Sequence, residues 1–266
     1  MNRVQQPALA LFAAGIMGLG ILALFYRDFA LVWQPVAAWV PGRALLACGS
    51  GMLMLVAGAG LLFRATAAWS VRILFPYLVA WAMLKVPALV AAPLVEGNWL
   101  GLGELTVLLA GGWTLFATLG DIAPSSRLGW MTGARGVRAA RILFALSLLP
   151  IGLSHLVYAQ ATAGYVPSWL PGRIFWAYLT GVGQMACGIG VLIRLWPRVA
   201  ATAEAIQVSL FTLLVWAPAI AAAPQTRLPW TAFFISWAIA AAAWVVAANL
   251  AAKSPASPAG PANRAA

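Results

Sequence analysis

Long apolar segments alternate with short polar ones along the chain, and this pattern predicts an all-α membrane protein. An α-helix needs about 20 mostly apolar residues to cross a bilayer. Eight segments meet that requirement, so we expect eight transmembrane helices. They cover roughly residues 7–26, 43–63, 70–92, 101–120, 141–160, 173–193, 199–222 and 230–250.

The two ends of the chain depart from this pattern. The first apolar segment follows Met-Asn-Arg and has no small-residue cleavage site behind it. We therefore interpret it as a membrane anchor rather than a cleaved signal peptide. Residues 251–266 are rich in Pro, Ala and Ser and contain nothing to bury, which is typical of a disordered tail.

Composition supports the membrane interpretation. Apolar residues make up 64% of the chain and charged residues 8%, whereas soluble domains carry roughly 25% charged residues. The 16 Lys and Arg outnumber the 5 Asp and Glu, but they occur singly or in pairs between apolar segments. They form no basic face that would bind nucleic acid, so the expected surroundings are the lipid bilayer.

The basic residues also predict the orientation of the chain. With the N-terminus inside, eleven fall on the cytoplasmic side and four on the outer side, with Lys85 inside a helix. Positive charge concentrates on the cytoplasmic side of membrane proteins. Both termini are thus expected in the cytoplasm, in a bacterial-type inner (plasma) membrane. The cytoplasmic set is Arg3, Arg64, Arg72, Arg127, Arg135, Arg138, Arg141, Arg194, Arg198, Lys253 and Arg264, and the outer set is Arg27, Arg43, Arg173 and Arg227.

An internal repeat divides the chain into two halves. Segment 39–64 aligns without a gap with 169–194, 130 positions later, and 87–93 aligns with 218–224, 131 positions later. The first pair shares Trp39, Pro41, Gly42, Arg43, Ala47, Gly51, Gly58, Gly60, Leu62 and Arg64. Apolar bias does not align Pro, Gly, Arg and Trp in order, so the repeat indicates a duplication.

The duplication predicts two parallel four-helix bundles. Each copy has an even number of spans, so both copies face the same way and a pseudo-two-fold axis lies along the membrane normal. The expected division is a first unit over 1–120, a basic cytoplasmic linker over 121–140, a second unit over 141–250 and the tail over 251–266.

Six repeated glycines fall inside the second helix of each unit. Small residues let helices approach closely in lipid, so we interpret these positions as helix-packing sites. They are Gly51, Gly58 and Gly60 in the first unit, and Gly181, Gly188 and Gly190 in the second.

The second half contains a G-x-x-H helix, a V-P-x-W-L-P segment and a Gly-rich second helix, between Gly152 and Gly190. In these motifs it resembles the DoxX family of four-helix membrane proteins. The first half departs from the pattern, with Phe25 and Ala37 in place of the His and the first Pro. The resemblance implies a link to thiosulfate:quinone oxidoreductase subunits and to membrane complexes in redox or thiol-stress handling. The matching residues are Gly152, His155, Val166, Pro167, Trp169, Leu170, Pro171, Gly181, Gly188 and Gly190.

Three ionisable residues share one expected depth near the outer leaflet: Lys85, Glu104 and His155. Such residues are expensive inside a membrane and mark candidate functional sites. Together they could bind a quinone head group, with Lys85 and Glu104 at ion-pair distance. Alternatively, Lys85 extends to the interface, or the two charges only neutralise each other, and His155 only packs. Glu204 and Gln207 lie close to the expected cytoplasmic end of their helix, so we interpret them as interfacial residues, and Arg198 could pair with Glu204.

Several chemistries are excluded by what the sequence contains. One His and two separated Cys supply no metal or haem site within the chain, and no nucleotide-binding or nucleophile motif occurs. No catalytic motif defines an enzyme, and any redox cofactor would come from a partner or be a quinone. We expect a non-catalytic membrane subunit or scaffold that docks a soluble oxidoreductase at its cytoplasmic face. The alternatives are a quinone- or small-molecule-handling oxidoreductase component and a small-molecule transporter.

Overall fold

The computed structural model describes residues 5–251, and every regular element in that range is helical. Eight helices are long and apolar enough to cross a membrane, with Pro197–Ala222 counted as one, as the sequence predicted. Residues 1–4 and nearly all of the predicted tail lie outside the described residues. The elements are α1 (Gln5–Tyr26), α2 (Arg43–Leu61), α3 (Arg64–Ala91), α4 (Glu96–Leu119), η1 (Gly129–Met131), α5 (Gly133–Val157), α6 (Ala159–Tyr165), α7 (Arg173–Leu192), α8 (Pro197–Phe211), η2 (Thr212–Trp216), α9 (Ala217–Ala222) and α10 (Arg227–Ala251).

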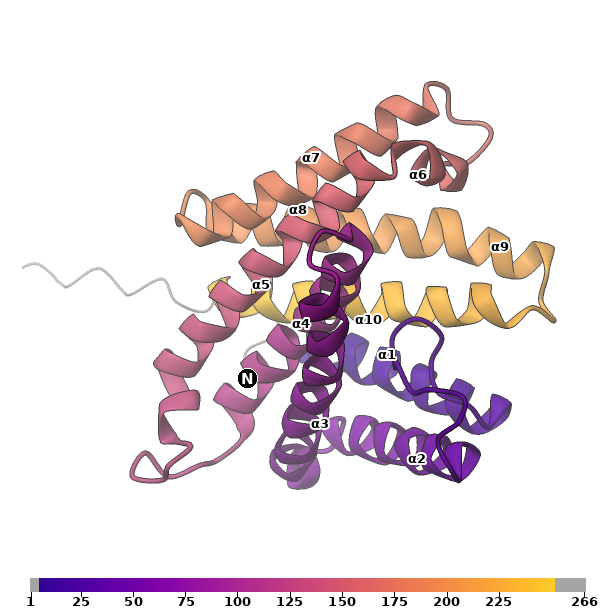
Figure 1. Cartoon of the computed structure of the whole chain (residues 1–266). Helices are drawn as coiled ribbons and strands as arrows, with labels where there is room; N and C mark the ends of the chain where they lie inside the picture. Colours follow the sequence, from indigo (N-terminus) through magenta and orange to yellow (C-terminus); the bar gives the residue numbers. More distant parts are fainter. Residues whose placement is uncertain (1–4, 252–266) are drawn as a thin grey trace, which may run out of the picture.

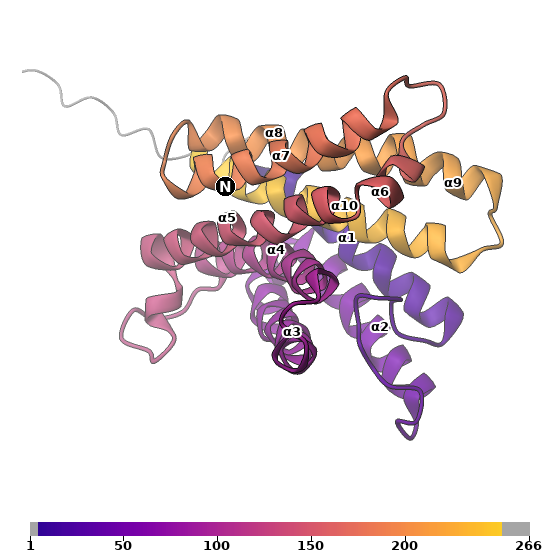
Figure 2. The ribbon, with the colours of Figure 1, turned by 45° about the horizontal axis from the view of Figure 1, so that its top comes forward.

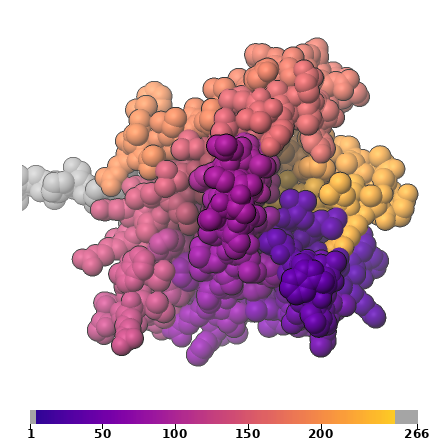
Figure 3. All heavy atoms as spheres, viewed as in Figure 1, coloured from indigo at the N-terminus to yellow at the C-terminus, as the bar shows by residue number. Residues whose placement is uncertain are grey.

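The long helices pack in chain order, and the two repeats contact each other extensively (Figures 1 and 2). In the first repeat α1 packs on α2, α2 on α3 and α3 on α4, and the second repeats this order with α5, α7, α8 and α10. Between the repeats, α4 packs on α5 and α10 packs on α1. The space-filling view shows the α3–α4 hairpin crossing the face between α5 and the loop after α1 (Figure 3).

Helices α4 and α10, which the repeat equates, cross at the centre of the molecule (Figure 1). At the crossing Gly111 faces Ala242, its own counterpart 131 positions later. A Cβ on Gly111 would lie only 2.6 Å from the Ala242 Cβ, so a larger residue does not fit there. Contact between equivalent positions is the geometry that a two-fold axis produces between two copies.

Glycines bring the first two helices of each repeat close together. A Cβ on Gly51 of α2 would lie 2.8 Å from the Gly20 carbonyl oxygen of α1. In the same way, a Cβ on Gly181 of α7 would lie 2.6 Å from the Gly152 carbonyl oxygen of α5. Close backbone approach of this kind is how membrane helices gain packing contacts.

These contacts also correct the alignment of α1 with α5. The ungapped alignment of the sequence pairs His155 with Phe25, but the structure places His155 where α1 has Ala23, since each lies against the repeated glycine of the next helix. Ala23 and His155 are 132 positions apart, as are Phe12 and Phe144, which are both 0% exposed. The chain between the first and second helices is therefore two residues longer in the first repeat.

A single π-helical turn, η2, accounts for the change of the repeat spacing from 130 to 131. Buried positions of α3 and α8 match at 130 as far as Thr212, whereas Pro87 and Pro218 match at 131. The extra residue therefore lies between 212 and 218, where the structure has η2. A π-turn accommodates one inserted residue without breaking the helix. The matched buried pairs are Val71 and Ala201, Leu74 and Glu204, Leu78 and Val208, and Ala82 and Thr212.

Candidate functional site

Lys85, on the last third of α3, reaches across to the loop that follows α1. Its Nζ donates a hydrogen bond to the carbonyl oxygen of Val32, and the side chain is half-buried. Gly101 at the start of α4 makes room for it, because a Cβ there would lie 3.2 Å from the Lys85 Nζ. The lysine thus ties the loop to the α3–α4 hairpin through a backbone carbonyl.

Glu104 lies one helical turn beyond Gly101 on α4, and its charge interacts with that of Lys85. The two side chains nevertheless form no ion pair among the described residues, so the direct contact expected from the sequence is wrong. Instead, the Lys85 Nζ donates to the Val32 carbonyl oxygen, which belongs to the loop that covers the lysine. Glu96, at the start of α4, adds a second carboxylate whose two oxygens are buried without a hydrogen-bond partner.

His155 faces the second repeat rather than Lys85. Its Nδ1 lies 2.9 Å from the Thr180 hydroxyl oxygen on α7, and its ring stacks on Phe211 of α8 with centroids 5.8 Å apart. The Thr180 hydroxyl donates to the Trp176 carbonyl oxygen at 2.8 Å, so Nδ1–H is the donor to Thr180. The structure therefore brings Lys85 near Glu104 and places His155 in a separate polar contact between α5, α7 and α8.

Glu204 on α8 is a site that the sequence interpretation missed. Its side chain is 1% exposed and makes no ion pair with Arg198, so the expected pairing with Arg198 is wrong. Because α8 begins at Pro197, Glu204 lies two turns into the helix, about 10 Å from its start. Its partner is Gln184 of α7, also buried, whose Nε2 donates to Oε1 of Glu204 at 3.1 Å.

The first repeat has a polar cluster in which every hydrogen-bonding group has a partner. The Nε2 of Gln34 donates to the Ser50 hydroxyl at 3.0 Å and to the Tyr77 hydroxyl at 2.9 Å. The two hydroxyls are 2.7 Å apart, and the Gln34 Oε1 accepts the Ala30 amide at 2.9 Å. Such a network fixes the loop after α1 on its own repeat.

Asp28 connects the two repeats at the end of the molecule where α1 ends. It forms ion pairs with Arg43 at the start of α2 and, at 2.9 Å, with Arg227 at the start of α10. Burial raises the pKa of Asp28, but the hydrogen bonds from Arg227 and the Phe29 amide and the charges of both arginines outweigh it, so the pKa is lowered. The carboxylate therefore stays ionised and holds both arginines.

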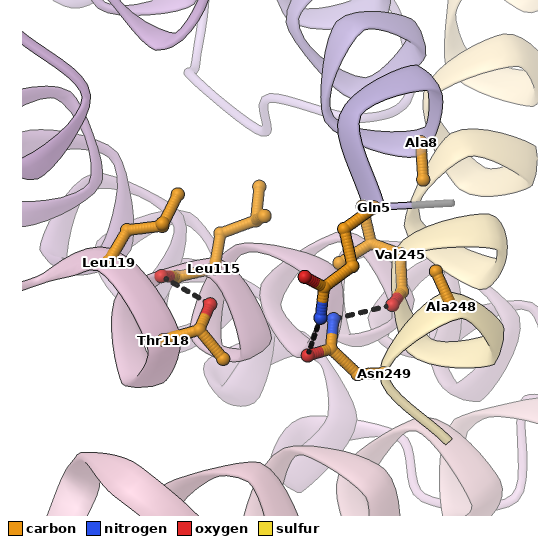
Figure 4. A pocket seen from close by; sticks show the side chains of 8 residues that line it. All are labelled: Gln5, Ala8, Leu115, Thr118, Leu119, Val245, Ala248 and Asn249. Atoms are coloured by element: carbon orange, nitrogen blue, oxygen red, sulfur yellow. Dashed lines mark hydrogen bonds between the residues drawn. The ribbon is translucent and has the colours of Figure 1, made fainter. Parts of the chain in front are cut away.

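A shallow pocket lies at the opposite end, between the beginning of α1 and the ends of α4 and α10 (Figure 4). The Nε2 of Gln5 donates to Oδ1 of Asn249 at 3.2 Å, and Asn249 donates to the Val245 carbonyl oxygen at 2.9 Å. The other lining side chains are mostly apolar, as Figure 4 shows. These contacts close the junction between the repeats and present no reactive group.

No cluster of three His, Cys, Asp or Glu side chains within residues 5–251 could hold a metal ion. The two cysteines of the described chain, Cys48 and Cys187, are free thiols on different helices. Comparison with models of protein families, with curated proteins and with solved structures found no match to this chain.

Proposed function

We propose that the chain is a multi-pass protein of a bacterial-type inner membrane, built from two four-helix units related by a pseudo-two-fold axis. In this proposal it is a non-catalytic membrane subunit or scaffold that holds a soluble oxidoreductase at its cytoplasmic face. The contact of Gly111 with its repeat counterpart Ala242 supports the two-fold arrangement. The eight long apolar helices support the membrane placement.

The scaffold role is inferred from exposed basic residues that gather at one end of the molecule. Six exposed arginines lie at the α2–α3, α4–α5 and α7–α8 connections, which alternation of the helices places at one end. At the opposite end, Arg43 and Arg227 are occupied by Asp28. A surface of unpaired positive charge faces the cytoplasm in membrane proteins and attracts acidic partners. The basic end comprises Arg64, Arg127, Arg135, Arg138, Arg194 and Arg198.

The redox assignment of the partner rests on the resemblance to the DoxX family in the second repeat, carried by Gly152, His155 and the Pro-Trp segment that follows. Family members of this kind are expected beside soluble redox enzymes. The chain itself offers few polar groups for chemistry, since charged residues make up 8% of it. A non-catalytic subunit needs the fewest polar side chains, so it agrees best with this composition.

Site-specific photo-cross-linking in native membranes tests this role. A photoreactive residue at position 135 or 198 should trap one soluble protein that carries a redox cofactor. The same residue at position 173, on the opposite end, is the matched control and should not trap that protein. Absence of any adduct from both basic positions, or equal trapping from position 173, would contradict the scaffold role.

A quinone- or small-molecule-handling component is the second candidate. It is favoured by His155, a titratable group whose Nδ1 is held by Thr180, and by the neighbouring charges of Lys85 and Glu104. A donor and a proton-exchanging group at fixed positions are what a quinone carbonyl requires. Mass spectrometry of the protein purified in mild detergent distinguishes the candidates, because only this one predicts a stoichiometric quinone that His155→Phe removes.

A further inference from the structure

We propose that Glu204 and Gln184 form a proton-binding site inside the second repeat, in which the carboxyl group carries a proton that it shares with the Gln184 amide oxygen. The inference uses the membrane placement proposed above but is independent of the scaffold role. The ligand is a proton, and the bound form is a neutral acid–amide pair between α8 and α7.

The proposal rests on two buried oxygen atoms that have no hydrogen-bond partner. The Gln184 Nε2 donates to the Glu204 Oε1 at 3.1 Å, and this leaves the Glu204 Oε2 and the Gln184 Oε1 without any hydrogen bond. The side chains are 1% and 2% exposed, so water does not satisfy these atoms. Two acceptors cannot bond to each other, but a proton on Oε2 makes it a donor to the amide oxygen. One proton therefore satisfies both atoms.

The surroundings supply no charge that would stabilise an ionised carboxylate. On α7 the titratable neighbour of Glu204 is Cys187, whose thiol contacts the Glu204 backbone. The helix α10 packs on α8, where Trp244 donates to the Ser209 hydroxyl, and its ionisable residue, Arg227, is bound to Asp28 at the far end. About two turns beyond Glu204, η2 begins with Thr212, whose hydroxyl donates to the Val208 carbonyl oxygen. A buried carboxylate without a counter-charge takes up a proton.

The first repeat provides an internal control for the role of this pair. The positions 130 residues earlier are Met54 and Leu74, which are 0% and 1% exposed. The same helix interface therefore packs with two apolar side chains, and neither an acid nor an amide is needed to build it. The exchange of both members in the second repeat alone indicates a function for the acid–amide pair rather than a requirement of the fold.

A second polar contact lies beside this pair, between α8, α7 and the end of α5. Gln207, one turn beyond Glu204, donates from its Nε2 to the Thr180 carbonyl oxygen at 3.0 Å, and Gly183 leaves room for its side chain. The Thr180 hydroxyl then contacts His155 at 2.9 Å. These groups connect α8, α7 and α5, and they form a polar contact separate from the acid–amide pair, because no hydrogen bond among the described residues joins Gln207 to Glu204 or Gln184.

Infrared spectroscopy of the full chain in lipid nanodiscs tests the proposal, because a protonated carboxyl has a carbonyl stretch that a carboxylate lacks. The chain has only 5 Asp and Glu, so one carboxyl can be assigned by difference. At neutral pH the protein should show an acid carbonyl band that Glu204→Gln removes. In Gln184→Met the band should shift to higher frequency, because the acid loses its amide partner.

The matched control is the double variant Gln184→Met/Glu204→Leu, which copies the pair of the first repeat. It should fold with unchanged helical circular dichroism and a higher thermal midpoint, and it should lack the band. Absence of a Glu204 band from the folded wild type at neutral pH would overturn the proposal, because the carboxyl would then be ionised. A band that appears only when sodium is withdrawn would also overturn it, in favour of a cation site.

Chemical labelling gives a second measurement of the protonated carboxyl group. Dicyclohexylcarbodiimide attacks protonated carboxyl groups in apolar surroundings, and peptide mass spectrometry should find it on Glu204.

Discussion

Enlarging Gly111 should force apart the two repeats where they cross. In Gly111→Ala the new Cβ would lie 2.6 Å from the Ala242 Cβ and 2.8 Å from its Cα, whereas ordinary contacts are 3.4–4 Å. The helices must therefore separate by roughly 1 Å, and overpacking of this kind costs about 1–3 kcal/mol. Unfolding in mixed detergent micelles, followed by tryptophan fluorescence, measures the loss of stability.

The reciprocal exchange gives this prediction its control. In Gly111→Ala/Ala242→Gly the closest contact is removed while the contact at 2.8 Å remains, so part of the loss should be recovered. Gly49→Ala, where a Cβ would meet nothing within 4 Å, should be neutral or stabilise by up to about 1 kcal/mol. A Gly111→Ala protein as stable as the wild type would refute the crossing, and so would a double variant no more stable than the single one.

Three further predictions concern other parts of the molecule. The pKa of Asp28 is lowered in the folded chain, so its stabilising effect is complete above the unfolded pKa, about 3.9, and disappears as the pH falls through the folded value. Thermal unfolding scanned from pH 6 downwards should show this loss, and Asp28→Asn should make that part of the profile flatter. Lys85→Met and Glu104→Leu should show a coupling below about 1 kcal/mol in a double-mutant cycle, because the two groups form no direct ion pair; a larger coupling would mean that they meet. Deleting Leu213 from the π-turn should leave a folded protein with a continuous helix, whereas deleting Ala203 from the preceding α-helix should abolish folding, as judged by gel filtration in detergent.

Much of the fold could be predicted from the sequence because its strongest signals are local. Eight apolar segments of spanning length identify the long helices, and the aligned Pro, Gly, Arg and Trp residues identify the repeat. Helix ends were less well predicted: α5 begins at Gly133, so Arg135 and Arg138 lie on its first turns rather than in a loop. Basic residues suit both a loop and the solvated end of a helix, so charge alone does not separate them.

The environment of the polar residues could not be predicted, because it depends on contacts between helices. Depth along a helix suggested that Lys85 and Glu104 meet, but the loop after α1 folds back and offers the Val32 carbonyl oxygen instead. The rotation of α5 that turns His155 towards Thr180 follows from the close approach of Gly152 and Gly181. Neither effect has a signature within a single segment.

Glu204 did have a signal in the sequence. At a spacing of 130 it aligns with Leu74, and Gln184 aligns with Met54, so both polar residues replace apolar ones at matched positions. The comparison of the two repeats therefore identifies two apolar residues of the first repeat that are polar in the second. Nearness along the chain favours a pair with Arg198 instead, but the Arg198 side chain lies on the exposed surface.

The orientation of the chain in the membrane can be tested directly by cysteine accessibility in intact cells. With Cys48 and Cys187 replaced by Ala, single cysteines in Arg135→Cys and Arg173→Cys report on the basic end and on the opposite end. A membrane-impermeant maleimide should label position 173 in intact cells and position 135 only after permeabilisation. Labelling of both positions in intact cells, or of position 135 alone, would contradict a membrane subunit whose basic end faces the cytoplasm.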